Sequence, residues 1–366
     1  MTLYIHPTVI SRSLINKGDT SHLKAVISRA EKGEPVTIGV IGGSITQGAN
    51  SSEPDLCYAN LVLKWWKDSF PNTNFHFVNA GIGATGSHYG VLRLTRDLLN
   101  HAPDFVVIEY AVNDPNTKDS AETLEGIVRQ LLKSHKSPAL LLLFMMRTNG
   151  ENAQQCLSKI GEHYNLPMIS FRDALWPEIE AGRLQWSEAM ADEVHPNDKG
   201  HAYAAELVTR YLEDIKRDTA SQIQLPFSEH LPVPLISDLF DRVHLYEAGE
   251  LSPTVDHGWT RDTSSSEWTA STPGSTFECE VYGKYIAIRY YRIHGDMGRV
   301  GVYVDSRPPV VLDGWFEETW GGYGAVDVVA RDLELGNHKV RVVVLDEMAP
   351  ESNGHLFRLL GIGVAV

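Results

Sequence analysis

The sequence predicts an α/β domain followed by an all-β sandwich. Over the first 220 residues, short apolar runs alternate with helix-like stretches, and the runs are continuously apolar. Beyond residue 220 only short β-like runs remain, separated by turn residues. Continuous apolar runs are typical of strands covered on both faces, and strand–helix alternation favours a parallel sheet between helical layers. We therefore expect a three-layer α/β/α domain over residues 1–220 and a β-sandwich over 221–366.

Short connections link the strands and helices expected in the first domain, as a parallel sheet with crossover helices requires. The predicted strands cover 36–43, 74–80, 105–111, 139–146 and 168–171, and the predicted helices cover 56–68, 89–100, 120–136, 152–164 and 198–216.

The second domain has no long helical period, and turn residues separate its β-like runs, as in Leu335-Gly-Asn-His338. Its predicted strands cover 275–281, 285–292, 300–305, 326–330 and 338–346. Short strands at even spacing favour an antiparallel sandwich of the jelly-roll or carbohydrate-binding-module type. Residues 222–234 contain three prolines and predict a linker.

Composition excludes several function classes. Lys+Arg 32 against Asp+Glu 47 gives a net charge of −15, which disfavours binding to nucleic acid or an acidic membrane. Three scattered cysteines and the lack of an H-E-x-x-H motif predict no disulfide framework, no metal site and no cofactor. We read no secretory signal, and the longest apolar run, 139–146, is too short to span a membrane. We expect a cytoplasmic protein.

Ser44 directly follows the first predicted strand, in Ile41-Gly-Gly-Ser-Ile-Thr-Gln-Gly48. Ligand sites of open parallel sheets lie outside the carboxyl ends of the strands. Glycines beside the serine let the backbone turn sharply, which exposes the hydroxyl and aims amide N–H groups at a substrate oxygen. By itself the stretch is more typical of an ordinary strand-to-loop turn.

Three further polar side chains stand where such a site needs them. Asn113, after the strand 105–111, can donate to an oxyanion, although Asn-Asp-Pro is also common turn chemistry. Asp192 lies three residues before His195, so its carboxylate can reach the imidazole Nδ1 and fix the tautomer that accepts a serine proton. A solvated loop capping the next helix would have a similar sequence.

Taken together, these blocks occur in the order and spacing of the SGNH (GDSL-like) hydrolases. The blocks are Ser44, the glycine-rich stretch 79–86, Asn113 and Asp192-x-x-His195. Residues 35–215 resemble that superfamily. The resemblance implies that Ser44 is the nucleophile, His195 the general base and Asp192 the residue that orients the histidine.

The resemblance also implies an oxyanion hole. Its donors would be the Ser44 amide, the Asn113 side chain and one amide of the glycine-rich stretch, either Gly83 or Ala84. The chain departs from the family pattern twice, since Gly-Asp-Ser is here Gly42-Gly43-Ser44 and Gly-x-Asn-Asp is Ala111-Val-Asn-Asp114. The first departure removes a carboxylate beside the nucleophile.

A rival interpretation rests on the same glycine-rich stretch. Gly81-Ile-Gly-Ala-Thr-Gly86 is formally G-x-G-x-x-G between a strand and a helix, as in dinucleotide-binding folds, with Glu109 as the acidic partner of a ribose. This interpretation leaves Ser44, Asn113 and the Asp192–His195 pair unexplained.

Within the superfamily the chain most resembles two-domain carbohydrate esterases that remove acetyl groups from plant polysaccharide fragments. Gly-Gly-Ser-Ile-Thr-Gln-Gly and Asn-Ala-Gly-Ile-Gly-x-Thr-Gly-Ser favour that branch. The resemblance implies an acetyl-serine intermediate and acetylated mannan or xylan oligosaccharides as substrates. Four tryptophans of the second domain suit sugar binding because indoles stack on the apolar faces of sugar rings: Trp259, Trp268, Trp315 and Trp320.

Four residues are candidates for contact with substrate, each with a structural alternative. Trp315 and Trp320 stand in a loop-like segment and are as typical of core packing as of a sugar platform. Trp186 can line the cleft or anchor the core, and Arg147 can contact substrate hydroxyls or lie on the surface.

Two alternative functions remain open at this point. A lipase- or thioesterase-type acyl hydrolase would use the same residues on a longer acyl chain, and a non-catalytic carbohydrate-binding protein would keep the site as a relic. The sequence also leaves open whether the chain forms a homo-oligomer.

Overall fold

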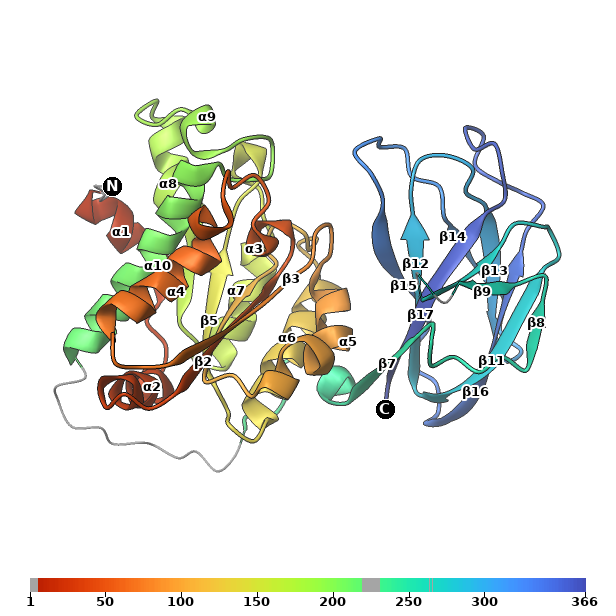
Figure 1. Cartoon of the computed structure of the whole chain (residues 1–366), viewed down its shortest axis with the longest axis horizontal. Coiled ribbons are helices and arrows are strands. Elements are labelled where there is room, and N and C mark those ends of the chain that lie inside the picture. Colours follow the sequence, from red (N-terminus) through yellow and green to blue (C-terminus); the bar gives the residue numbers. More distant parts are fainter. Residues whose placement is uncertain (1–5, 219–230, 263, 265) are drawn as a thin grey trace. The chain divides into compact units, whose positions relative to one another are not determined.

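The computed structural model describes residues 6–218, 231–262, 264 and 266–366. It divides into two compact units, Met1–Asp238 and Leu239–Val366 (Figure 1). The predicted domain boundary after residue 220 and most of the predicted linker 222–234 lie outside the described residues.

Unit 1 is built on a six-stranded sheet in the order β1-β6-β5-β4-β2-β3. The strands are β1 (Leu14–Asn16), β2 (Val36–Gly42), β3 (Phe75–Gly81), β4 (Phe105–Glu109), β5 (Ala139–Phe144) and β6 (Met168–Ser170). Strands β2 to β6 are parallel and β1 pairs antiparallel with β6. The predicted strands are confirmed, and their carboxyl ends meet at one edge of the sheet.

Helices cover both faces of this sheet, which confirms the three-layer α/β/α class (Figure 1). One face carries α2 (Ser21–Glu31), α4 (Tyr58–Ser69), α8 (Phe171–Glu180) and α10 (Asp198–Asp218), whose apolar residues share one core with β2, β4 and β5. The other face carries α5 (Ser87–Asp97), α6 (Lys118–Lys133) and α7 (Gln154–His163). Short helices stand at α1 (Pro7–Ser13), α3 (Ser44–Gln47), η1 (Pro54–Leu56), η2 (Leu99–His101), η3 (Thr148–Gly150) and α9 (Trp186–Ala189).

Sequence reasoning missed α2, α8 and the edge strand β1. Helix α2 buries only a narrow stripe that includes Leu23, Val26 and Ile27, so its polar residues hide the helical period. Helix α8 follows β6 without a loop and contains Pro177, which reads as a helix breaker. Strand β1 has three residues, too few to show a pattern.

Unit 2 consists of two antiparallel sheets, which confirms the all-β sandwich. One sheet has the order β15-β12-β17-β10-β9, with β7 also paired to β17, and the other has the order β14-β13-β16-β11-β8. The strands are β7 (Val243–Glu247), β8 (Val255–His257), β9 (Thr260–Asp262), β10 (Glu267–Ala270), β11 (Thr276–Gly283), β12 (Tyr285–Arg292), β13 (Arg299–Val304), β14 (Val310–Asp313), β15 (Tyr323–Ala330), β16 (Gly336–Val344) and β17 (Phe357–Ala365), preceded by η4 (Leu239–Asp241).

The unpredicted strand β17 lies at the centre of its sheet, between β12 and both β7 and β10. Its sequence, FRLLGIGVA, is almost uniformly apolar, which is the pattern that predicted the inner strands of unit 1, so β17 could have been recognised on the same ground. The strand is buried nearly throughout, which explains that composition.

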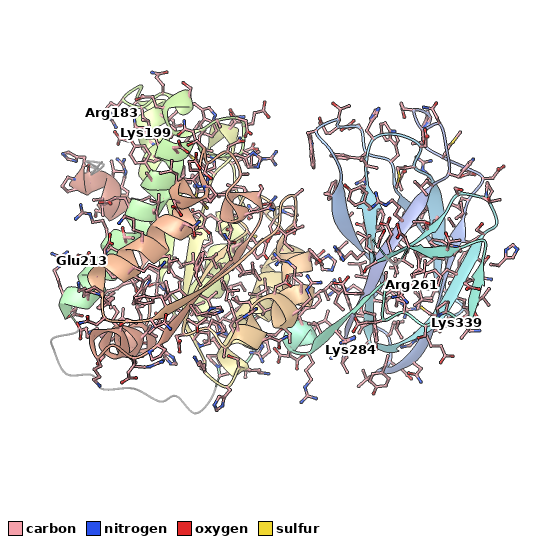
Figure 2. The ribbon with its side chains drawn as sticks, viewed as in Figure 1. Arg183, Lys199, Glu213, Arg261, Lys284 and Lys339 are labelled. Carbon is pink, nitrogen blue, oxygen red and sulfur yellow. The ribbon has the colours of Figure 1, made fainter. Side chains whose placement is uncertain are left out.

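Several charged side chains of unit 1 lie on its outside. In unit 1, Arg183, Lys199 and Glu213 lie at the outer surface (Figure 2). Lys199 pairs there with Glu188 at 3.1 Å.

Across the residues placed by the structure, no helix is both apolar enough and long enough to cross a bilayer.

Candidate active site

Ser44 is presented at the carboxyl end of β2 by a sharp strand-to-helix turn. The chain leaves the sheet at Gly42, and Ser44 is the first residue of the four-residue helix α3. Gly48 ends this helix with φ 108°, in the left-handed region that favours glycine, and its N–H donates back to the Ser44 carbonyl at 3.0 Å. The turn places the serine at the edge of the sheet where all the parallel strands end.

Asp192 and His195 reach Ser44 from one loop, and His195 lies 151 residues after Ser44 in the chain. The Ser44 Oγ lies 2.8 Å from His195 Nε2, and His195 Nδ1 lies 2.8 Å from Asp192 Oδ2. The three side chains form one hydrogen-bonded line from hydroxyl through imidazole to carboxylate. This geometry permits the serine proton to pass to Nε2 while the carboxylate stabilises the charged ring.

The Asp192 carboxylate is held in its ionised form by its own loop. Burial opposes ionisation, but hydrogen bonds from the backbone N–H groups of His195 and Val194 and from the His195 ring outweigh it, so the pKa of Asp192 lies below its ordinary value. Two contacts fix the loop itself: the Trp186 indole N–H donates to the Asp192 carbonyl at 2.9 Å, and the Thr148 N–H donates to the Glu193 carbonyl at 2.7 Å.

Asn113 follows β4 and packs directly against the residue before the nucleophile. A Cβ built on Gly43 would collide with Asn113 Oδ1 and press on the Thr85 carbonyl. The space of a side chain at position 43 is thus filled by Asn113. Glycine is therefore the residue that this packing accommodates at position 43.

The glycine-rich stretch after β3 makes a turn beside α3. The Gly83 N–H donates to Gln47 Oε1 at 2.9 Å, and a Cβ on Gly83 would lie 3.8 Å from the Ser44 Cβ. Ala84 has φ 56°, and among the residues the structure describes no acceptor is found for its N–H. Of the two amides left open by the sequence, Gly83 is engaged by Gln47 and Ala84 is available.

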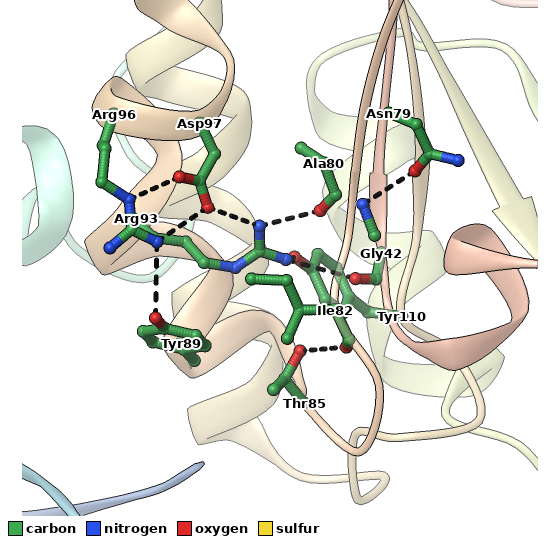
Figure 3. A network of polar contacts seen from close by, with 11 residues as sticks. Gly42, Asn79, Ala80, Ile82, Thr85, Tyr89, Arg93, Arg96, Asp97 and Tyr110 are labelled. Carbon is green, nitrogen blue, oxygen red and sulfur yellow. Dashed lines mark hydrogen bonds and ion pairs between the residues drawn. The ribbon is translucent and has the colours of Figure 1, made fainter. Parts of the chain in front are cut away.

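A buried arginine joins the strand ends that carry these turns (Figure 3). Arg93 of α5 is fully buried and donates to the carbonyls of Gly42 (3.2 Å) and Ala80 (2.8 Å) and to the Tyr110 hydroxyl (3.1 Å). Its charge is balanced by Asp97 at 2.9 Å. The guanidinium thereby connects the ends of β2, β3 and β4. The burial of Arg93 was not predictable from the sequence, because an arginine within a polar helix pattern carries no signal of burial.

Two buried carboxyl groups lie under the site. Desolvation raises the pKa of Glu109 to about 8 and that of Asp114 to about 7. Glu109 Oε2 accepts from the Thr46 hydroxyl at 3.2 Å, and Asp114 Oδ1 accepts from the Ser87 N–H at 2.8 Å. Because Glu109 is fully buried beneath α3, it cannot bind a ribose, which argues against the dinucleotide interpretation.

The substrate-contact candidates have different surroundings. Trp186 packs against the core of unit 1 and supports the Asp192 loop, and Arg147 is exposed at the end of β5, next to Thr148. In unit 2, Trp320 is 60% exposed and stacks on Tyr323, whereas Trp315 is half-buried. Roles in substrate binding stay predictions for all four.

The two other tryptophans of unit 2 lie in its core. Trp259 is 4% exposed and Trp268 is 7% exposed, and both pack near Phe277. The expectation that they suit sugar stacking is wrong, since their rings fill the space between the two sheets.

As for metals, the part of the chain that the structure places holds no group of three or more histidine, cysteine or acidic side chains arranged to bind an ion.

Comparisons with known proteins relate both units to characterised proteins. A model of the GDSL-like lipase/acylhydrolase family matches residues 40–203. The crystal structure of a two-domain esterase active on acetylated mannans is 36% identical, with a TM-score of 0.90, over 97% of this chain and 98% of that one. A structure of a two-domain esterase active on acetylated mannans, co-crystallised with mannopentaose, is also 36% identical, with a TM-score of 0.89, over 97% of each chain. Thioesterase 1/protease 1/lysophospholipase L1 of Escherichia coli (strain K12) is 23% identical over 187 residues, which cover 49% of this chain and 84% of that protein.

Proposed function

The chain belongs to the GDSL-like lipase/acylhydrolase family and is a serine ester hydrolase, and on that premise we propose that it removes O-acetyl groups from oligosaccharides derived from plant polysaccharides. Acetylated mannan fragments are the first candidates and acetylated xylan fragments the second. The observation that carries the proposal is the unbroken hydrogen-bonded line from Ser44 through His195 to Asp192. The similarity to a two-domain esterase active on acetylated mannans supports the substrate class.

The chemistry follows from the positions of these side chains. Ser44 Oγ attacks the acetyl carbonyl carbon while His195 Nε2 takes its proton, and the carbonyl oxygen becomes an oxyanion. The histidine then gives this proton to the departing sugar oxygen, which leaves an acetyl group on Ser44. A water molecule, deprotonated by His195, attacks the acetyl-serine, and acetate leaves as the serine recovers its proton.

The oxyanion rests on three donors in this proposal. They are the backbone N–H groups of Ser44 and Ala84 and the side-chain amide of Asn113. Ala84 is preferred to Gly83 because Gln47 already accepts from the Gly83 N–H. Ala84 also has a left-handed backbone conformation. Residues other than glycine seldom adopt this conformation, and it is maintained only where the surrounding structure fixes it.

We assign the contacts with the sugar to exposed side chains. Arg147, at the end of β5, is a donor for substrate hydroxyl groups, and Trp320 offers an exposed indole face to a sugar ring. Trp315 and Trp186 are secondary candidates, since the first is half-buried and the second anchors the Asp192 loop.

Turnover of defined substrates tests this proposal. The full-length protein should release acetate from acetylated mannan oligosaccharides, read by mass spectrometry, and should cleave p-nitrophenyl acetate faster than p-nitrophenyl octanoate. Ser44→Ala should lower both acetyl activities by about 10³-fold or more because the nucleophile is removed. Full activity of Ser44→Ala would refute the mechanism.

A lipid or thioester substrate is the alternative, and the similarity to the E. coli thioesterase/lysophospholipase favours keeping it under test. In that case octanoate esters should be cleaved faster than acetate esters. A non-catalytic carbohydrate-binding protein would cleave neither ester, and the hydrogen-bonded Ser44–His195 pair argues against it.

A further inference from the structure

The loop that follows the nucleophile helix α3 is tied to the segment that carries Asp192 and His195. Three contacts join them: Asn50 Nδ2 donates to Asp192 Oδ2 at 2.9 Å, Ser52 donates to Asp198 through its N–H and its hydroxyl, and His201 Nε2 binds the Ala49 carbonyl at 3.0 Å. Besides the Ser44–His195 hydrogen bond, these contacts connect two parts of the chain about 150 residues apart.

The Asn50 contact falls on the oxygen that the catalytic line uses. Asp192 Oδ1 accepts the backbone N–H groups of Val194 and His195, each at 2.7 Å. Oδ2 accepts His195 Nδ1 at 2.8 Å and Asn50 Nδ2 at 2.9 Å. Asn50 is therefore the contact to Oδ2 that comes from outside the Asp192 loop itself.

This contact matters because Asp192 is not protected from solvent. Its side chain is 46% exposed, against 26% for His195, so water can compete for Oδ2. A fixed donor from a second loop limits that competition without adding charge. An oriented carboxylate in turn keeps the imidazole aligned on Ser44, and small errors in such alignment reduce rate strongly.

The backbone at Asn50 points to the same role. Asn50 has φ 62°, in the left-handed region that side-chain-bearing residues seldom adopt, with asparagine among the most tolerant. In this conformation the amide donates to Asp192 Oδ2. The backbone on either side is held by the Ala49 carbonyl, which accepts from His201, and by the Ser52 N–H, which donates to Asp198.

We propose that Asn50 is a positioning residue of the active site, which holds Asp192 Oδ2 in the orientation that His195 requires. The inference rests on the proposed serine-esterase function. Asn50 touches neither Ser44 nor a reacting atom; it acts through Asp192.

The titratable groups around this contact are Asp192 and His195 on their own loop and His201 and Asp198 on α10. His201 is buried on α10, where its Nδ1 accepts the Tyr58 N–H at 3.3 Å and its Nε2 donates to the Ala49 carbonyl at 3.0 Å, and burial lowers its pKa. Asp198 is ionised and bound to Ser52. A new charge at position 50 would thus act chiefly on Asp192 and His195.

Four variants of the full-length protein test the proposal, with p-nitrophenyl acetate as substrate. Asn50→Gly removes the amide and favours the left-handed backbone, and Asn50→Ala removes the amide and disfavours that backbone. Asn50→Asp keeps the shape and replaces the donor with a carboxylate. Ser52→Ala is the matched control, because it removes the hydroxyl bond to Asp198, keeps the backbone N–H bond to the same carboxylate and does not reach Asp192.

We expect Asn50→Gly and Asn50→Ala to lower kcat by about tenfold at nearly constant KM. Asn50→Asp should move the acidic limb of the kcat/KM profile up by about half a pH unit, because a second carboxylate stabilises the protonated imidazole. Ser52→Ala should stay within about twofold of the wild type, with an unchanged profile.

The proposal is overturned if the Asn50 variants match Ser52→Ala in both kcat and pH profile. It is also overturned if Ser52→Ala loses as much rate as Asn50→Gly, because loop integrity would then explain the effect. Melting temperatures measured on all four variants identify any loss caused by unfolding. Failure of the proposed function is a separate outcome, since it would show as a wild type no more active than Ser44→Ala.

Discussion

Gly43 and Asn113 show how one residue governs another at this site. Asn113 Oδ1 occupies the space that a side chain at position 43 would need. The proposed oxyanion donor therefore owes its position to the missing Cβ of Gly43. A residue-level coupling of this kind can be measured.

A double-mutant cycle tests the coupling between these two residues. Asn113→Ala should lower kcat for p-nitrophenyl acetate by about 10²–10³-fold, because one oxyanion donor is lost. Gly43→Ala should lower kcat by about tenfold or more by displacing Asn113. In the Asn113→Ala background the same change at Gly43 should cost less than about twofold. Additive losses would show that the two residues act independently.

Glu109 makes the stability of the protein depend on pH. Burial raises its pKa in the folded protein to about 8, from its ordinary value of 4.5. Between these two pH values the folded state binds more protons than the unfolded state, so the free energy of unfolding falls as pH rises. The loss is complete above about pH 8 and absent below about pH 4.5.

Glu109→Gln should remove this dependence. The variant cannot ionise, and its amide oxygen can still accept from Thr46. We expect its melting temperature, relative to the wild type, to rise steadily between pH 5 and pH 8, by scanning calorimetry. Glu31→Gln, at an exposed residue of α2, should show no such trend. A constant difference between Glu109→Gln and wild type would show that Glu109 is ionised in the fold.

The sequence predicts those residues of the candidate site whose positions follow from local spacing along the chain. Asp192 and His195 share one short loop, and Ser44 and Asn113 each follow an apolar strand, so their meeting at one sheet edge follows from the parallel topology. Gln47 and Asn50 could not be found in this way. Their roles depend on which side chains face them across the site, which spacing along the chain does not encode.

At the scale of elements, Arg93 connects three strands through one buried charge. The carbonyls of Gly42 and Ala80 and the Tyr110 hydroxyl all accept from the same guanidinium (Figure 3). These groups stand at or just after the ends of β2, β3 and β4, where the turns of the site begin. Arg96 on the same helix binds the same Asp97 but is 46% exposed.

The two arginines make a matched pair for a stability measurement. Arg93→Met should lower the free energy of unfolding of unit 1 by about 3–5 kcal/mol, because Asp97 and two carbonyls lose their buried partner. Arg96→Ala should cost less than about 1 kcal/mol, as exposed ion pairs do. Urea unfolding of the two full-length variants provides the comparison. Equal losses in the free energy of unfolding would mean that both arginines stabilise the protein through Asp97 and not through the strand ends.

Helices and strands were predictable where the apolar pattern of their sequence indicates burial on one face or on both. The five inner strands of unit 1 are continuous apolar runs, and β11, β12, β13, β15 and β16 of unit 2 carry enough apolar and turn signal to be recognised. Strand β17 was not predicted, although it is continuously apolar like the inner strands of unit 1. The short β8, β9 and β14 are set by pairing with distant neighbours rather than by their own residues.

At the scale of the whole molecule, an esterase-type unit is joined to a sandwich that carries an exposed aromatic cluster. Trp320 stacks on Tyr323 and meets Phe316 edge-on, and the Arg292 guanidinium lies 5.6 Å from the centre of the Phe316 ring. Trp320 is 60% exposed within this cluster. An exposed indole held in place by neighbouring aromatic rings is the arrangement that a sugar-binding role requires.

Trp320→Ala tests that role. We expect about a five- to tenfold lower kcat/KM on acetylated mannan oligosaccharides, through a higher KM, because one stacking contact of about 1 kcal/mol is lost. Activity on p-nitrophenyl acetate, which has no sugar, should not change. Tyr282→Ala, at another exposed aromatic residue of unit 2, is the control. Equal activity of Trp320→Ala and Tyr282→Ala on both substrates would exclude Trp320 from substrate binding.

The proposed mechanism requires Ser44 to form a covalent acetyl-enzyme. We would quench the full-length protein with acid during turnover of p-nitrophenyl acetate and map the acetyl group by peptide mass spectrometry. We expect acetylation at Ser44, lost in Ser44→Ala and strongly reduced in His195→Ala. Acetyl groups found only on other residues, or equally on Ser44 without His195, would contradict it.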